Sequence, residues 1–136
     1  MTLTVYCDAS VLIKRTGGES DSDAVDGLID GFTADSATLI TSTLAQVEVR
    51  RALNRVGLAS DNDDEGDDYL LATLGGVHLV VIDADVLDLA GRIPTRHLGT
   101  LDSIHLATAL LSHADVMLTR DSELARACDD VGLAVA

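Results

Sequence analysis

Short apolar runs alternate with amphipathic stretches along almost the whole chain, and this alternation limits the folds it can adopt. Runs such as 3–7 and 116–118 are rich in aliphatic residues, whereas the stretches between them repeat apolar residues every three or four positions. The first pattern predicts buried strands and the second predicts helices. Strands that alternate with helices are typical of an α/β domain whose parallel sheet is joined by right-handed crossovers.

The same periodicities give approximate bounds for the individual elements. Strands are expected at 3–7, 39–41, 78–82 and 116–118, with a short fifth strand at 133–135. Helices are expected at 9–14, 23–32, 44–56, 69–74, 84–92, 101–113 and 122–129. A polar loop is expected at 17–22. Thr43 and Gln46 are spaced as a capping box for the third helix.

The length of 136 residues corresponds to one domain, which we expect to cover residues 1–136. No run approaches the roughly 20 apolar residues of a membrane span, and the first residues lack the pattern of a secretory signal. We therefore expect a cytoplasmic protein without a membrane segment. Cys7 and Cys128 do not have the spacing of a metal or redox motif, so they are most simply buried thiols, and a disulfide between them stays open.

The densest acidic segment, SDNDDEGDD at 60–68, resembles a calcium loop only in composition. Counted from Asp61, the twelfth position is Ala72, where an EF-hand requires a bidentate glutamate. We interpret the segment as a solvated loop or the start of a helix.

Four other acidic residues lie where an α/β sheet places its functional groups. Asp8 directly follows the first strand, and Asp121 closely follows the fourth. Asp102 opens the most apolar helix, and Glu48 lies within LAQVEVRRAL, in the middle of another. Ligands of open parallel sheets bind beyond the carboxyl ends of the strands. We expect all four side chains at that edge.

A carboxylate in apolar surroundings is costly unless it is paired or binds a metal. Hard oxygen ligands suit Mg²⁺ or Mn²⁺, and one or two such ions can activate a water and clamp a scissile phosphate. Each residue also has a structural interpretation. Asp8 and Asp121 could cap helices, Asp102 could complement a helix dipole, and Glu48 could pair with an arginine of its own helix.

The sequence motifs DAS at 8–10, Glu48, LDSIHLATAL at 101–110 and TRD at 119–121 resemble those of PIN-domain nucleases, in particular VapC toxins. The likeness covers almost the whole chain, and the 101–110 segment is its most specific part. It implies a three-layer α/β/α sandwich with a central, mainly parallel sheet of four to five strands. It also implies Mg²⁺- or Mn²⁺-dependent endonucleolytic cleavage of RNA, homodimerisation and inhibition by a VapB-type antitoxin.

The resemblance assigns catalytic, metal-ligating roles to four residues, namely Asp8, Glu48, Asp102 and Asp121. It assigns supporting hydroxyl positions to Ser10 and Thr119. Gly99 departs from the pattern, because family members often carry a basic residue there. We interpret His105, one helical turn after Asp102, as a packing residue or a neighbour of the ligands.

The net charge of −14 opposes binding of a polyanion, because nucleic-acid-binding proteins usually present a basic surface. Acidic residues spread over a solvated surface, or neutralised by divalent cations, would weaken this objection. Local phosphate contacts would then come from arginines near the motifs. The candidates are Arg15, Arg50, Arg51 and Arg120.

Two other functions compete with the ribonuclease. The chain could be a catalytically silent PIN-fold module that acts through protein contacts, although four intact carboxylates argue against this. It could also be a receiver-type phospho-acceptor domain, which likewise clusters acids around Mg²⁺. That fold needs an acidic pair after its first strand and a late lysine, whereas Asp8 is single and Lys14 is the one lysine.

Overall fold

A computed structural model describes residues 2–15, 22–58 and 64–136 of the chain. The strands are β1 (Thr4–Cys7), β2 (Thr38–Ser42), β3 (Val77–Val80), β4 (Val116–Leu118) and β5 (Ala134–Val135). The helices are α1 (Ala9–Lys14), α2 (Ser22–Ala34), α3 (Leu44–Arg55), α4 (Asp64–Thr73), α5 (Ala84–Arg92), α6 (Thr100–Leu111) and α7 (Ser122–Val131). Most of the expected loop at 17–22 and the first part of the acidic segment lie outside the described residues.

All five strands pair in parallel, in the order β3-β2-β1-β4-β5. The chain leaves β1 toward β2 and β3 on one side, then returns to build β4 and β5 on the other. The strand order therefore reverses at β1, and the edge beyond the carboxyl ends of β1 and β4 is the switch point where ligands of such sheets bind.

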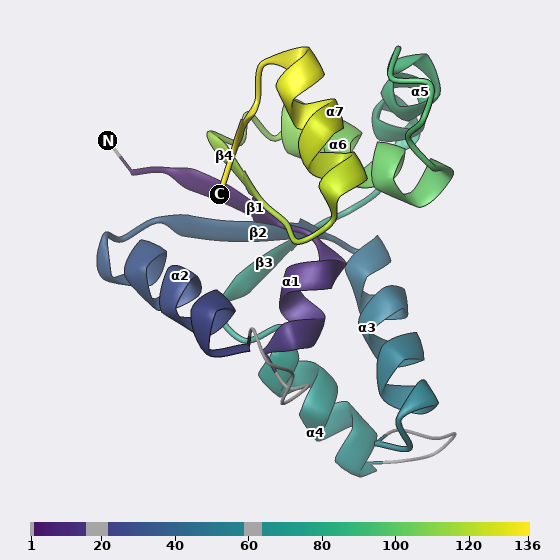
Figure 1. The fold of residues 1–136 in the computed structure, drawn as a ribbon. Coiled ribbons are helices and arrows are strands. Elements are labelled where there is room, and N and C mark those ends of the chain that lie inside the picture. The colour runs from purple at the N-terminus through teal and green to yellow at the C-terminus, as the bar shows by residue number, and fades with distance from the viewer. Residues whose placement is uncertain (1, 16–21, 59–63) are drawn as a thin grey trace.

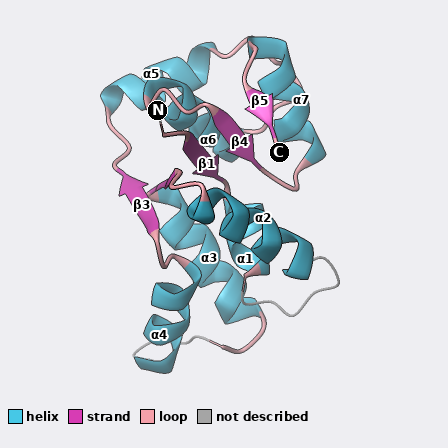
Figure 2. Cartoon of the chain, turned by 90° about the vertical axis from the view of Figure 1, so that its left-hand side faces the viewer, coloured by secondary structure: helices cyan, strands magenta, loops and turns pink. Residues whose placement is uncertain are grey.

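Helices cover both faces of the sheet, as the sandwich prediction requires. In Figure 1, helices α1 to α4 lie below the strands and α5 to α7 lie above them. Figure 2 shows the same two groups of helices from the side, with the C-terminal strand β5 at the outer edge beside β4. The predicted three-layer α/β/α fold is confirmed.

The two cores follow from the alternation of side chains along each strand. Val5 and Cys7 of β1 face the layer of α1, α2 and α3, where they pack in one cluster with Leu12. Tyr6 points to the opposite face and packs with Leu106 of α6 and Met117 of β4. A sheet buried on both faces needs apolar residues at successive positions, which explains the continuous apolar runs.

Both cysteines are buried and free, as predicted. Cys7 belongs to the core on one face of the sheet and Cys128 to the core on the other, so the sheet separates them and prevents a disulfide. Burial raises the pKa of each thiol to about 12, which keeps both protonated and unreactive at neutral pH.

The start of α3 and the end of α6 differ from their predicted form. The capping box at α3 is wrong, because the Thr43 side chain caps nothing and is already in the helical region. The Ser42 hydroxyl instead accepts a hydrogen bond from the Leu44 amide at 3.0 Å. Helix α6 ends at Leu111, before the predicted residue, since His113 adopts a left-handed conformation with φ 55°.

Within the described residues, no helix has both the length and the apolar character needed to cross a membrane.

Candidate functional site

Asp8 is the most buried acidic residue of the predicted quartet. It directly follows β1 and caps α1, with its side chain accepting a hydrogen bond from the Val11 amide at 3.2 Å. Oδ1 also accepts from the Ser10 hydroxyl at 2.6 Å, and Oδ2 accepts from the Thr119 hydroxyl at 2.7 Å. With 3% of the residue exposed, both oxygens are held by the protein.

The turn after β4 locks against Asp8 because β1 and β4 are neighbours. The Thr119 hydroxyl donates to Asp8 and accepts from the Asp121 amide at 3.0 Å. The Arg120 amide donates to the Ser10 hydroxyl at 3.0 Å. Asp121 caps α7, accepting from the Glu123 amide at 2.8 Å. The capping roles considered for Asp8 and Asp121 are therefore real, and they fix both carboxylates at one sheet edge.

Asp102 lies in the first turn of α6 and is crowded by the other acids. Burial raises its pKa, and the negative charges of Asp121 and Asp8 act in the same direction, so that together they bring it to about 6. Burial also raises the pKa of Asp8, against the hydrogen bonds from Ser10 and Thr119 that favour its charged form. The three aspartates thus form one electrostatically strained group.

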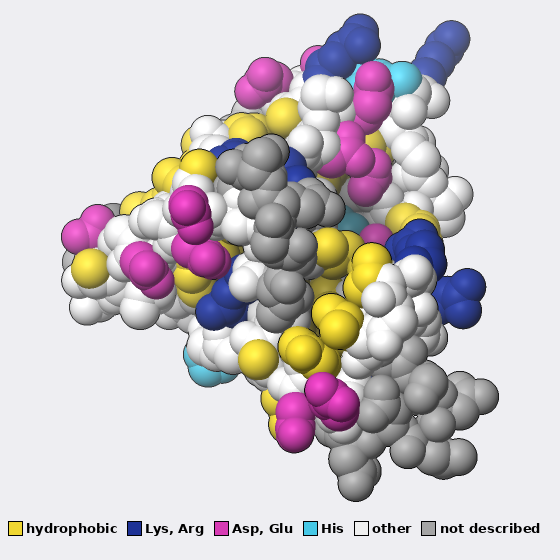
Figure 3. All heavy atoms as spheres, turned by 60° about the horizontal axis from the view of Figure 1, so that its bottom comes forward, with side chains coloured by type: hydrophobic (Ala, Val, Ile, Leu, Met, Phe, Trp, Pro, Cys, Tyr) yellow, Lys and Arg dark blue, Asp and Glu magenta, His cyan; other side chains and the backbone are white. Residues whose placement is uncertain are grey.

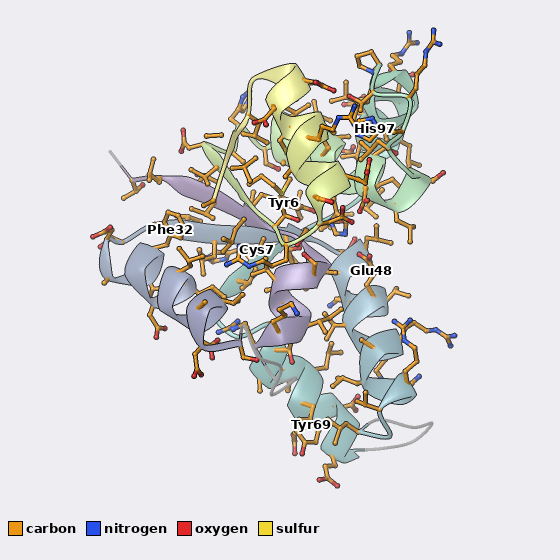
Figure 4. All side chains as sticks on the ribbon, in the orientation of Figure 1. Tyr6, Cys7, Phe32, Glu48, Tyr69 and His97 are labelled. Atoms are coloured by element: carbon orange, nitrogen blue, oxygen red, sulfur yellow. The ribbon has the colours of Figure 1, made fainter. Side chains whose placement is uncertain are left out.

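Glu48 joins this region through a histidine. Its Oε1 lies 2.5 Å from Nε2 of His105 on α6, so it pairs across to another helix and not along its own. The other ring nitrogen, Nδ1, lies 2.6 Å from the hydroxyl of Tyr6 on β1. Figure 4 places Tyr6 and Glu48 near the carboxyl edge of the sheet, close to where α1 and α3 begin.

Tyr6 was not among the residues predicted for the site, and His105 was assigned only a supporting place. The sequence held a signal for each. Tyr6 is a phenol in an apolar strand two residues before Asp8, and a buried hydroxyl needs a partner. His105 follows Asp102 by one helical turn, which places both side chains on one face of α6.

The donor set suits a hard divalent cation. Carboxylate oxygens are the ligands of Mg²⁺ and Mn²⁺, and a bound cation would relieve the repulsion that raises the pKa of Asp102. In the part of the chain that the structure describes, no three or more acidic, histidine or cysteine side chains lie close enough together to hold a metal ion as they stand.

The four candidate arginines occupy different environments. Nη1 of Arg15 donates to the backbone carbonyls of Thr73 and Gly75, each at 2.8 Å, where α4 ends. Arg50 forms an ion pair with Asp67 of α4. The other two candidate arginines are exposed: Arg51 lies on α3, and Arg120 lies beside the site.

The acidic charge is distributed over the surface. Figure 3 shows aspartate and glutamate side chains in separate groups on one face, with hydrophobic side chains and some lysine or arginine side chains between them. This distribution leaves room for local contacts between arginines and phosphates despite the net charge of −14.

Comparisons with known proteins agree with this architecture. A family model for the PIN domain matches residues 5–130. Ribonuclease VapC46 from Mycobacterium tuberculosis (strain ATCC 25618 / H37Rv) is 33% identical over 136 residues, covering 96% of this chain and 95% of that protein. Ribonuclease VapC35 from the same strain is 32% identical, covering 96% of this chain and 94% of that protein.

Solved structures show the same fold at low identity. VapBC2 from Rickettsia felis, bound to a DNA fragment from its promoter, has a TM-score of 0.74 at 13% identity, with 98% of each chain covered. VapC20 from Mycobacterium tuberculosis, described as a toxin that cleaves the sarcin-ricin loop, has a TM-score of 0.70 at 17% identity, covering 90% of this chain and 94% of that one. By its family match and its VapC relatives, the chain belongs to the PIN-domain family.

Proposed function

We propose that this chain is a metal-dependent endoribonuclease and the toxin of a pair with a VapB-type antitoxin. The observation that carries the proposal is that Asp8, Asp102 and Asp121 lie together at the switch point of the sheet. The charges of Asp8 and Asp121 are near enough to raise the pKa of Asp102. The relatives named as ribonucleases support the reaction. The structural neighbours solved as toxin–antitoxin complexes support the partner.

In this proposal the four acidic residues hold Mg²⁺ or Mn²⁺. Bound there, a divalent cation would make water more acidic and stabilise the negative charge that develops on a phosphodiester. Ser10 and Thr119 orient the two oxygens of Asp8, and the caps of α1 and α7 keep Asp8 and Asp121 in place. None of these side chains has to form a covalent intermediate.

The role proposed for the arginines is narrower than the sequence suggested. Arg120 lies next to Asp121, and its backbone amide is bonded to Ser10, so it is well placed to contact a phosphate at the site. Arg51 is exposed on the helix of Glu48. Arg15 and Arg50 are held by contacts with α4, and we assign them to packing between helices.

The test is cleavage of RNA by purified wild type and Asp8→Asn, with Mg²⁺, with Mn²⁺ and with EDTA. We expect metal-dependent cleavage by the wild type and a loss of at least about 100-fold in the variant, because the substitution removes a buried charge to which two hydroxyls donate. Asp129→Asn, an exposed acid on α7, is the matched control and should cleave normally. Folded wild type that cuts no RNA with either metal would favour the binding module.

The partner and the assembly require separate measurements. Co-expression with a VapB-type protein should give a stable complex that suppresses cleavage, and its absence would remove the antitoxin from the proposal. Homodimerisation, which the family resemblance implies, stays a prediction. Light scattering during size-exclusion chromatography measures it directly, with one chain mass or two as the possible results.

A further inference from the structure

A chain of hydrogen bonds leads from the backbone of β2 through two buried side chains to Glu48. The Ser42 amide donates to the Tyr6 hydroxyl at 3.1 Å, and this hydroxyl lies 2.6 Å from Nδ1 of His105. Nε2 of His105 lies 2.5 Å from Oε1 of Glu48. The chain joins four elements, β2, β1, α6 and α3.

The direction of these hydrogen bonds follows from the number of protons available. The Tyr6 oxygen already accepts the Ser42 amide proton, so the phenol proton is free to go to Nδ1 of a neutral imidazole. The ring then carries its single proton on Nε2, from which it donates to Glu48. Tyr6 therefore selects the tautomer of His105 that can bind a carboxylate.

Burial shows from which side the histidine reaches Glu48. The side chain of His105 is 1% exposed, whereas that of Glu48 is 23% exposed. The imidazole accordingly contacts the carboxylate from the protein interior, and solvent or a ligand approaches from the other side. The ring edge of Tyr6 also packs against the imidazole, with the centroids 5.7 Å apart and the planes at 70°.

The position of His105 on α6 gives this contact a consequence for the whole site. His105 is one turn after Asp102, so the imidazole holds Glu48 of α3 to the helix that carries Asp102. Without this contact, Glu48 on α3 would be free to turn away from the helix that carries Asp102. Partners that fix a ligand's orientation typically change metal affinity by about 10- to 100-fold.

We propose that His105 and Tyr6 are positioning residues that hold Glu48 ready to bind a divalent cation. The inference rests on the proposed function, since it assumes that Glu48 is a metal ligand. It assigns no proton transfer to either residue. A purely structural role for the same residues would change the stability of the fold and leave metal affinity unaltered, so the two roles can be separated experimentally.

The experiment measures Mn²⁺ affinity by the loss of the EPR signal of free Mn²⁺ during titration of the metal-free protein. His105→Leu should bind Mn²⁺ about 10- to 100-fold more weakly than wild type. Tyr6→Phe, which keeps the ring and removes the donor to Nδ1, should show a smaller loss. His105→Gln keeps an N–H donor and should recover part of the affinity lost in His105→Leu.

A matched control lies one turn further along the same helix. Thr108 is fully buried, and its hydroxyl donates only to the Ile104 carbonyl at 2.7 Å. Thr108→Val therefore perturbs the core of α6 without touching the chain to Glu48, and it should keep wild-type Mn²⁺ affinity even if its melting temperature falls. Melting curves of all the variants without metal show which of them are folded.

The outcomes distinguish this inference from the proposed function. Wild-type affinity in folded His105→Leu and Tyr6→Phe would overturn the inference, as would equal losses in His105→Leu and His105→Gln. If His105→Leu does not fold, Tyr6→Phe decides. If Asp8→Asn loses Mn²⁺ binding but the His105 and Tyr6 variants do not, the proposed metal site is supported and this inference is refuted. Wild type that binds no Mn²⁺ would refute both.

Discussion

Single residues in the site combine structural and chemical roles, and Asp8 is the clearest case. The side chain that caps α1 is the one that Ser10 and Thr119 orient at the switch point. A cap alone requires a carboxylate near an amide, but it does not require two further hydroxyl donors. The accumulation of donors around one buried acid is more than an ordinary helix cap requires, and it supports the ligand role proposed for Asp8.

Asp102 makes a prediction about pH in the metal-free protein. Its pKa of about 6 in the folded state exceeds the ordinary value of 3.8, so between these values the folded protein binds a proton that the unfolded chain lacks. This contribution to stability is present at low pH and is lost as the pH rises toward 6. Asp102→Asn should flatten the dependence and stabilise the metal-free protein at pH 7 by about 1 kcal/mol, after allowance for solvent screening.

Urea unfolding at several pH values between 4 and 7, in the presence of EDTA, measures this effect. Asp129→Asn, which replaces an exposed acid, serves as the control and should keep the wild-type pH dependence. An Asp102→Asn variant that is less stable than wild type at pH 7 would show that the carboxylates are not strained in the absence of metal.

At the scale of elements, Arg15 illustrates how sequence proximity can mislead. It lies in sequence just beyond the first motif, which suggested a phosphate contact. In the structure its guanidinium reaches across to the C-terminal end of α4 and donates to two carbonyls there. The Thr73 carbonyl is among the groups that the end of α4 leaves without partners, and a cation near this end also complements the helix dipole.

Arg15→Met should therefore destabilise the fold by about 1.5–3 kcal/mol, because hydrogen bonds from a charged donor are lost while the aliphatic stem is kept. Mn²⁺ affinity should not change. The exposed Arg51→Met is the comparison, with an expected change in stability below about 0.5 kcal/mol. Unfolding in urea measures both variants. Unchanged stability of Arg15→Met together with weaker RNA binding would restore the phosphate contact suggested by the sequence.

At the scale of the whole molecule, the net charge of −14 opposes approach to RNA. Added salt screens this repulsion, with a Debye length of about 10 Å at 0.1 M. We expect the rate of RNA cleavage at fixed Mg²⁺ to hold steady or rise between low salt and about 0.1 M. For a basic protein, by contrast, the logarithm of the nucleic-acid binding constant falls linearly with the logarithm of the salt concentration. A steep fall in RNA binding from the lowest salt upward would contradict this expectation.

The alternation of apolar runs determined the fold class, the parallel sheet and the approximate position of nearly every element. Strands buried on both faces and helices with one apolar face leave local signals that do not depend on their partners. The ends of the elements were less predictable. Thr43 looked like a helix cap, yet Ser42 accepts the amide instead, because the bend leaving β2 sets which hydroxyl reaches it.

The sequence also singled out Asp8, Glu48, Asp102 and Asp121, since each carboxylate stands after a strand or within an apolar helix. Only the tertiary structure decided how they are held. The contacts from Thr119 to Asp8, from His105 to Glu48 and from Tyr6 to His105 each join residues at least 57 positions apart. No local pattern encodes such pairs, because the order of the strands in the sheet brings them together from opposite faces at one edge.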